Sequence, residues 1–159
     1  MQQIFKKVNG CHYDVILATE TNWTEDIKSE EAFGSRFNVF RSDRDLQLTV
    51  KESGGGVLIA VNATLPSELL PTDKHAEFED VWVKVLMKNE KHLFVSAYFP
   101  PDMAKKASYE KFFKTAQLII ECLEPETKIH VYDDFNQNTI DFIQAVDKEY
   151  LLQPVSRRK

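Results

Sequence analysis

The chain has few cysteines and no long apolar segment. Only Cys11 and Cys122 are cysteines among its 159 residues, and neither belongs to a C-x-x-C pair. This usage argues against a disulfide framework or a structural zinc site and predicts two buried thiols in a reducing compartment. The first residues contain no apolar core of signal-peptide length, and the longest uncharged run, 54–67, is interrupted by Asn62 and Pro66. We therefore expect an intracellular protein, cytoplasmic or nuclear, with no signal peptide and no membrane span.

Glycine and proline are also scarce. The chain has 5 glycines and 6 prolines, while 43% of its residues are hydrophobic and 28% are charged. This composition is typical of a globular domain and excludes disordered, collagen-like and coiled-coil classes. We expect one domain, spanning residues 1–159.

A basic surplus is absent as well. The formal net charge is −5, and the acidic excess lies in residues 1–80; the one dense basic cluster is Arg157-Arg158-Lys159. Proteins that bind nucleic acid by neutralising its backbone usually carry a basic surplus. Any contact with DNA or RNA is therefore expected to be local or bridged by a metal ion.

Hydrophobic periodicity predicts an α+β fold. The predicted strands are 13–19, 37–42, 57–62, 81–87, 92–98 and 128–132. Helices are predicted over 2–9, from Ser108 as N-cap to Pro125, and over about 139–150, with a helical turn within 24–31. The continuous apolar run in 13–19 indicates a strand buried on both faces. Segments 81–87 and 92–98 are expected to form a hairpin with alternating faces.

Two predicted strands end in carboxylates. Glu20 follows the first strand, and Asp133 and Asp134 follow the last. Carboxylates at strand ends can converge on a hard cation such as Mg²⁺, which takes oxygen ligands and keeps waters for a phosphate substrate. Loop and capping roles fit the same pattern, so the residues alone leave both open.

Other polar residues carry weaker signals. Arg41 and Arg44 are expected to be solvated charges rather than phosphate contacts. Gly54–Gly56 precedes a strand and lacks the lysine of a P-loop, which argues against a nucleotide-binding role.

Six short motifs then occur in series: ATET (18–21), RSDR (41–44), GGGVLIAV (54–61), VWVKV (81–85), AYFPP (97–101) and DFN (134–136). In this order the chain resembles the endonuclease/exonuclease/phosphatase superfamily, and most closely the endonuclease domain of insect-type non-LTR retrotransposons. The resemblance covers 13–136 and is fainter through Gln153. It implies an α/β sandwich of two mainly antiparallel sheets flanked by helices, which cleaves phosphodiester bonds in DNA with Mg²⁺ or Mn²⁺.

The resemblance implies a role for four residues. Glu20 matches the metal-ligand glutamate, and Tyr98 matches a tyrosine that donates a hydrogen bond to a phosphate oxygen. Asp134 matches the aspartate that positions the attacking water, and Asn136 the amide donor for charge developing on phosphorus. From the residues alone, Glu20 also fits a solvated loop acid, Tyr98 a core or rim tyrosine, and Asp134 with Asn136 an Asx turn.

The sequence departs from the superfamily pattern at three places. The first strand with its metal-site asparagine and the C-terminal Asp-His segment have no counterpart, and Asp133 replaces a glycine. His92 and His130 are expected to be structural histidines. Loss of a general base costs about 10²- to 10⁴-fold in rate, so we expect weak or lost catalysis. The alternative is an inactive, domesticated binding module for a protein partner or a small molecule on the same scaffold.

Missing strands would also leave sheet edges and apolar surface uncovered. We therefore expect a homo-oligomer or a protein partner bound through exposed sheet edges, DNA as the partner of an active enzyme, and no membrane association.

Overall fold

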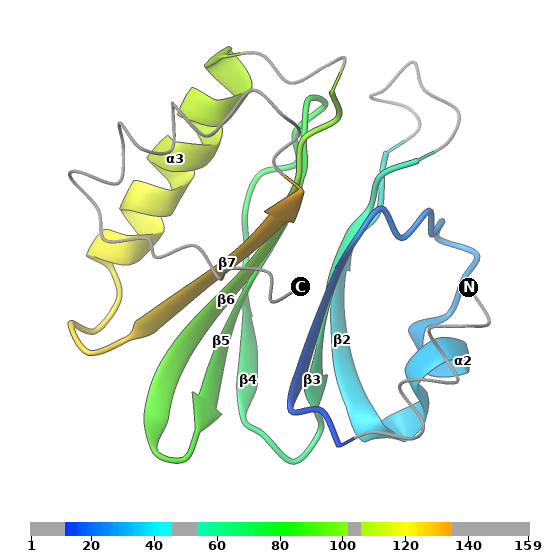
Figure 1. Cartoon of the computed structure of the whole chain (residues 1–159), viewed down its shortest axis with the longest axis vertical. Coiled ribbons are helices and arrows are strands. Elements are labelled where there is room, and N and C mark those ends of the chain that lie inside the picture. The colour runs from blue at the N-terminus through cyan, green and yellow to red at the C-terminus, as the bar shows by residue number, and fades with distance from the viewer. Residues whose placement is uncertain (1–11, 46–53, 102–105, 135–159) are drawn as a thin grey trace, which may run out of the picture.

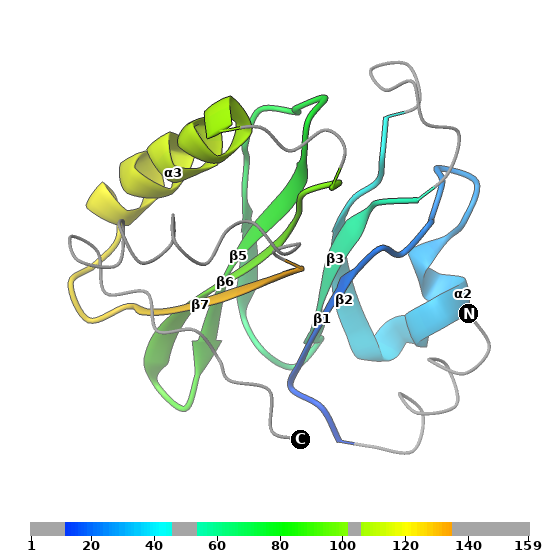
Figure 2. The same ribbon diagram turned by 45° about the horizontal axis from the view of Figure 1, so that its top comes forward.

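The structure, a computed structural model, describes residues 12–45, 54–101 and 106–134. Within these residues a three-stranded and a four-stranded sheet pack face to face (Figure 1). Helix α3 (Lys106–Glu121) covers the outer face of the larger sheet, and α2 (Ser29–Phe33) lies against the outer side of the smaller one (Figure 2). The predicted α+β sandwich of two mainly antiparallel sheets is confirmed.

The smaller sheet has the order β1-β3-β2 and is antiparallel throughout. Its strands are β1 (Val15–Thr19), β2 (Phe37–Ser42) and β3 (Val57–Asn62), and a 3-10 turn, Gly34–Arg36, precedes β2. The central strand β3 is buried on both faces, because alternate residues face the other sheet and the α2 layer. The edge strand β1 packs against the core on both faces, as predicted for 13–19, but its residues are only partly buried because it has a neighbour on one side alone.

The larger sheet has the order β4-β5-β6-β7. Its strands are β4 (Ser67–Leu70), β5 (Glu79–Met87), β6 (Glu90–Tyr98) and β7 (Lys128–Asp134). The predicted β5–β6 hairpin is confirmed. β7 pairs with β6 in parallel, and α3 provides the crossover that a parallel connection requires.

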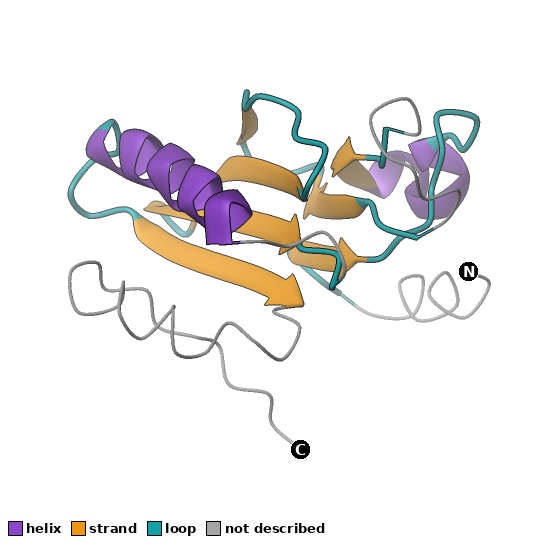
Figure 3. Ribbon diagram, turned by 90° about the horizontal axis from the view of Figure 1, so that it is seen from above, coloured by secondary structure: helices purple, strands orange, loops and turns teal. Residues whose placement is uncertain are grey.

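Helix α3 packs on the outer face of the larger sheet (Figure 3). Phe112 and Ala116 on the helix meet Trp82, Leu93 and Val95 on the strands, which alternate with the residues that face the smaller sheet. Burial of Phe112, Leu93 and Val95 stabilises the fold by about 1.5–3 kcal/mol for each side chain. No described helix has the length and apolar character needed to cross a membrane.

Two local predictions are wrong. The helix begins at Lys106, so Ser108 is a buried helical residue and not its N-cap; Lys106 and Ala107 carry no apolar period that could have marked the first turn. Cys122 lies just after the helix and is exposed, because the apolar side of α3 points elsewhere. Cys11 and the predicted helices at 2–9 and 139–150 lie outside the described residues.

Candidate functional site

Glu20 and Tyr98 meet at one end of the interface between the two sheets. Glu20 directly follows β1, Tyr98 is the last residue of β6, and the Tyr98 hydroxyl donates a hydrogen bond of 2.6 Å to Oε1 of Glu20. On the same two strands, the Ser96 hydroxyl donates to the carbonyl oxygen of Ala18 at 3.3 Å. Ser96 and Tyr98 project from the same face of β6 because they are two residues apart. Polar side chains therefore join the sheets where Glu20 lies.

The backbone that presents Glu20 is strained. Glu20 and Asn22 both have a φ of 53°, in the left-handed region that non-glycine residues rarely adopt. The backbone N–H groups of Thr21 and Asn22 donate to the carbonyl oxygens of Gly56 (3.2 Å) and Gly55 (2.9 Å), respectively. These contacts hold the loop while the Glu20 side chain stays exposed to solvent. Such strain persists only where surrounding contacts impose it, and it is common at functional sites.

Tyr98 is held as a hydrogen-bond donor. Tyr98 is only 5% exposed to solvent. Its pKa lies well above the ordinary value of a phenol, because burial and the hydrogen bond to the Glu20 carboxylate both oppose formation of a phenolate. The hydroxyl therefore stays protonated at neutral pH.

Asp134 is placed beside this pair by strand register. It is the last residue of β7, and the parallel ladder sets it directly opposite Tyr98. The structure thus brings the backbone of Asp134 to the same end of the sheet as Glu20 and Tyr98. The side chain of Asp134 and the whole of Asn136 lie outside the described residues.

A buried ion pair lies behind Tyr98. The Arg44 Nε donates to Oε1 of Glu79 at 2.7 Å, and the two side chains are 4% and 7% exposed. Glu79 is the cross-strand neighbour of Tyr98, and the Arg44 guanidinium lies 5.8 Å from the centre of the Tyr98 ring. Burial raises the pKa of Glu79, and the hydrogen bond and charge of Arg44 oppose that rise. The prediction that Arg44 is a solvated charge is wrong, because a carboxylate from the other sheet holds it inside the protein.

Arg41 is also a structural residue rather than a solvated charge. Its guanidinium donates to the carbonyl oxygens of Thr24 and Ile27, both at 2.6 Å, and forms an ion pair with Asp43. The guanidinium also lies 5.1 Å from the ring centre of Trp23. Arg41 therefore fixes the segment that follows the Glu20 loop, and the prediction that Arg41 is a solvated charge is wrong as well.

His92 and His130 lie at the other end of the larger sheet. His92 is near the start of β6 and His130 near the start of β7, whereas Tyr98 and Asp134 end these strands. His92 Nδ1 and His130 Nε2 are 3.0 Å apart, and the rings are within 18° of parallel. Burial lowers the pKa of both histidines. Neither imidazole is placed to act on a ligand at Glu20.

The exposed Glu20 carboxylate is the group at this end of the fold that could hold a cation. In residues 12–45, 54–101 and 106–134, no three or more histidine, cysteine, aspartate or glutamate side chains gather as a metal-binding group. Mg²⁺ commonly binds through one or two carboxylates and keeps several waters. An exposed carboxylate oriented by a tyrosine, as at Glu20, suits that mode.

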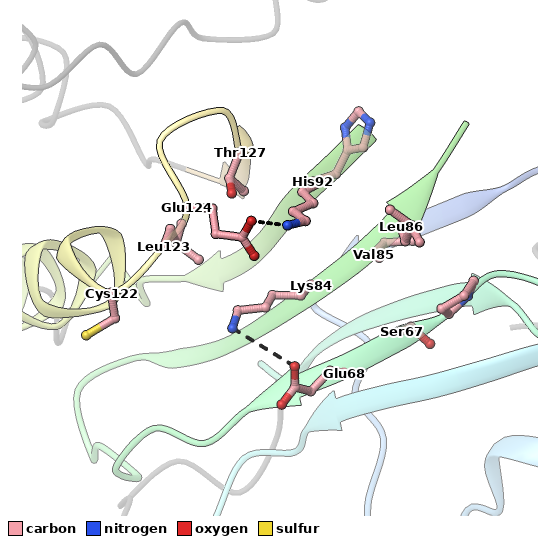
Figure 4. Close-up of a pocket in the computed structure, with 12 residues that line it drawn as sticks. Ser67, Glu68, Lys84, Val85, Leu86, His92, Cys122, Leu123, Glu124 and Thr127 are labelled. Carbon is pink, nitrogen blue, oxygen red and sulfur yellow. Dashed lines mark hydrogen bonds and ion pairs between the residues drawn. The ribbon is translucent and has the colours of Figure 1, made fainter. Parts of the chain in front are cut away.

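A groove of about 380 Å³ lies away from this site, near the β5–β6 turn (Figure 4). Lys84 forms an ion pair with Glu68 across it, and Lys91 with Glu124. These glutamates offset the positive charge that a phosphate ligand would need, so the groove has no advantage over the Glu20 end as a site for phosphodiester chemistry.

No protein-family model and no curated protein matches the chain. Solved structures do match. The endonuclease domain of TRAS1, a telomere-specific non-LTR retrotransposon, gives a TM-score of 0.64 at 14% identity over 93% of this chain and 63% of that one. The D. rerio TDP2 complexed with a single-strand DNA product gives 0.60 at 12% identity, over 91% and 56%. An endonuclease/exonuclease/phosphatase family protein from Leptotrichia buccalis gives 0.56 at 14% identity, over 91% and 64%.

These likenesses establish the fold. The chain has the same two-sheet sandwich fold as these structures, as its motifs predict, and it spans 56% to 64% of their length.

Proposed function

We propose that this chain is a retrotransposon-derived endonuclease-like domain that slowly hydrolyses phosphodiester bonds in DNA with Mg²⁺ or Mn²⁺. The observation that carries the proposal is the contact between the exposed Glu20 carboxylate and the Tyr98 hydroxyl, made from two sheets at one end of the fold. Support also comes from the likeness in fold to a retrotransposon endonuclease and to a protein solved with a DNA product.

Each residue has a distinct task in this proposal. Glu20 holds the cation, and Asp134 and Asn136 orient the attacking water and the phosphate. Tyr98 has one O–H donor, which serves Glu20 in the described structure; it can serve a phosphate oxygen instead when substrate is present. The cation, when bound, supplies positive charge that stabilises the phosphate oxygens in the transition state.

A second candidate function is a binding module with no catalysis, for a protein partner or a small molecule. The placement of His92 and His130 favours it, because both lie at the far end of β6 and β7 and leave Glu20 without an imidazole base from these strands. A rate loss of about 10²- to 10⁴-fold is the usual cost of a missing general base.

Nicking of supercoiled plasmid in the presence of Mg²⁺ or Mn²⁺ tests the proposal. Glu20→Gln and Asp134→Asn proteins are compared with Glu68→Gln, which removes an exposed glutamate on β4. We expect slow nicking by the unaltered chain and by Glu68→Gln, and none by the other two. No nicking by the unaltered chain, or nicking that survives both changes, would overturn the proposal in favour of the binding module.

A further inference from the structure

Arg44 contacts both halves of the proposed site, although these halves belong to different sheets. On one side lies the glycine segment that holds the Glu20 loop, and on the other lies Tyr98. Arg44 follows β2 of the smaller sheet, while its ion-pair partner Glu79 begins β5 of the larger one.

The contact with the glycine segment is too close for any side chain at position 55. A Cβ on Gly55 would lie 2.4 to 2.6 Å from the guanidinium atoms of Arg44, and Gly55 has a φ of +80°. The carbonyl oxygen of the same glycine accepts the N–H of Asn22, two residues after Glu20. The guanidinium therefore packs directly against the backbone that fixes the Glu20 loop.

The contact with Tyr98 is made by the same guanidinium. Its Cζ lies 5.8 Å from the ring centre, and Glu79, which holds Arg44 by its Nε, is the cross-strand neighbour of Tyr98. A cation at this distance from an aromatic face is attracted to it, and more strongly where water is excluded. One buried cation thus limits the positions of the Glu20 loop and of the Tyr98 ring together.

We propose that Arg44 is a positioning residue of the Glu20–Tyr98 site: its buried guanidinium sets the placement of Glu20 through Gly55 and of Tyr98 through its ring. The inference rests on the proposed function, because only that function makes the placement of Glu20 and Tyr98 matter for catalysis. A buried ion pair is weak evidence of stabilisation in itself, since its desolvation cost is comparable to its Coulomb energy. Because the Arg44 guanidinium also lies against Gly55 and the Tyr98 ring, the pair has a positioning role besides any effect on stability.

Gly55→Ala and Gly54→Ala form a matched pair that isolates the contact. Both glycines have a positive φ, +80° and +89°, so both substitutions introduce backbone strain. A Cβ at position 54, however, would lie at an ordinary 3.6 Å from the Arg44 Nη1. The difference between the two variants therefore reports the contact with the guanidinium.

The first readout is amide hydrogen exchange of Thr21 and Asn22, whose N–H groups bond to Gly56 and Gly55. It requires neither metal nor activity. We expect exchange at these two amides to be at least tenfold faster in Gly55→Ala than in Gly54→Ala. Equal exchange in the two variants would overturn the proposal, whatever the outcome of the nicking assay.

The second readout is affinity for MnCl₂ by calorimetry, with kcat and KM for plasmid nicking. Arg44→Lys keeps the charge but loses the planar guanidinium, and Arg41→Lys is its control, because Arg41 binds the neighbouring segment without touching Tyr98. We expect Arg44→Lys to lower Mn²⁺ affinity or kcat about 10- to 100-fold with KM little changed, as is usual for residues that orient metal ligands. The proposal would be overturned if Arg44→Lys is folded and its Mn²⁺ affinity and kcat are both within threefold of those of Arg41→Lys.

The outcomes separate the two proposals. An unaltered chain that binds no Mn²⁺ and does not nick DNA refutes the proposed function, and the exchange comparison still decides whether Arg44 positions the loop. Mn²⁺ binding with equal exchange in the glycine variants supports the site and refutes the role of Arg44.

Discussion

The Tyr98 hydroxyl lies 2.6 Å from Oε1 of Glu20, although the two residues are 78 positions apart and belong to different sheets. The Tyr98 side chain at the end of β6 thus holds the carboxylate of Glu20, the residue that follows β1. The contact therefore depends on how the two sheets pack and not on one loop alone.

Tyr98→Phe removes the hydroxyl and leaves the ring. We expect nicking to fall about 10²- to 10³-fold, the usual cost of losing one donor to transition-state charge. Stability should change by only about 0.5–1.5 kcal/mol, the net value of one hydrogen bond. Tyr132→Phe is the control, since Tyr132 is 45% exposed on β7. Equal nicking by both variants would remove Tyr98 from the mechanism.

Asp80 gives a prediction about stability alone. It is 7% exposed and accepts a hydrogen bond of 2.7 Å from the indole N–H of Trp82. Asp80→Leu leaves that N–H buried without its acceptor, so we expect a loss of about 1–3 kcal/mol in the free energy of unfolding.

Asp80→Asn is the matched variant, because its amide oxygen can still accept from Trp82. Burial raises the pKa of Asp80, which shows that its charge is costly in the fold. We therefore expect Asp80→Asn to be within about 1 kcal/mol of the unaltered chain. Urea unfolding checks both, and equal losses in the two variants would contradict the role given to the Trp82 hydrogen bond.

Much of the fold could be predicted because its strands have local signals. The bounds of β2 and β3 agree with the predicted 37–42 and 57–62, where apolar runs are bounded by glycine and polar residues. β4 was not predicted. Its four residues, SELL, show no alternation, and it is defined by its pairing with β5, the next strand along the chain.

The contacts within the proposed site could not be predicted from the sequence. Motif order singled out Glu20 and Tyr98, but their hydrogen bond depends on how two sheets pack, which no local pattern encodes. Arg44 was misjudged for the same reason, because its partner Glu79 is 35 positions away. The three consecutive glycines before β3 are conspicuous in the sequence, but only the structure shows that Gly55 lies against the Arg44 guanidinium.

His92, which is buried, and His130, which is partly buried, form a pair whose rings contact each other. Their ring nitrogens are 3.0 Å apart, so one ring donates and the other accepts while both are neutral. Burial lowers the pKa of both rings, and the charge of Lys128 lowers both further, whereas Glu90 raises that of His92. The folded chain therefore resists protonation more than the unfolded chain, in which histidine has a pKa of about 6.5.

The pair should make the fold sensitive to acid. Because the pKa values are lower in the folded state, the stabilisation is present above pH of about 6.5 and is lost as the pH falls towards the folded values, by at most about 1.4 kcal/mol per pH unit for each proton. His130→Gln keeps a partner for His92 and does not titrate, so its stability should fall less between pH 7 and pH 5. Urea unfolding across this range measures the difference between the two slopes. The raised pKa values of Glu79 and Asp80 act in the opposite direction in both proteins and therefore cancel. Parallel slopes would show that the histidine pair does not control the response to acid.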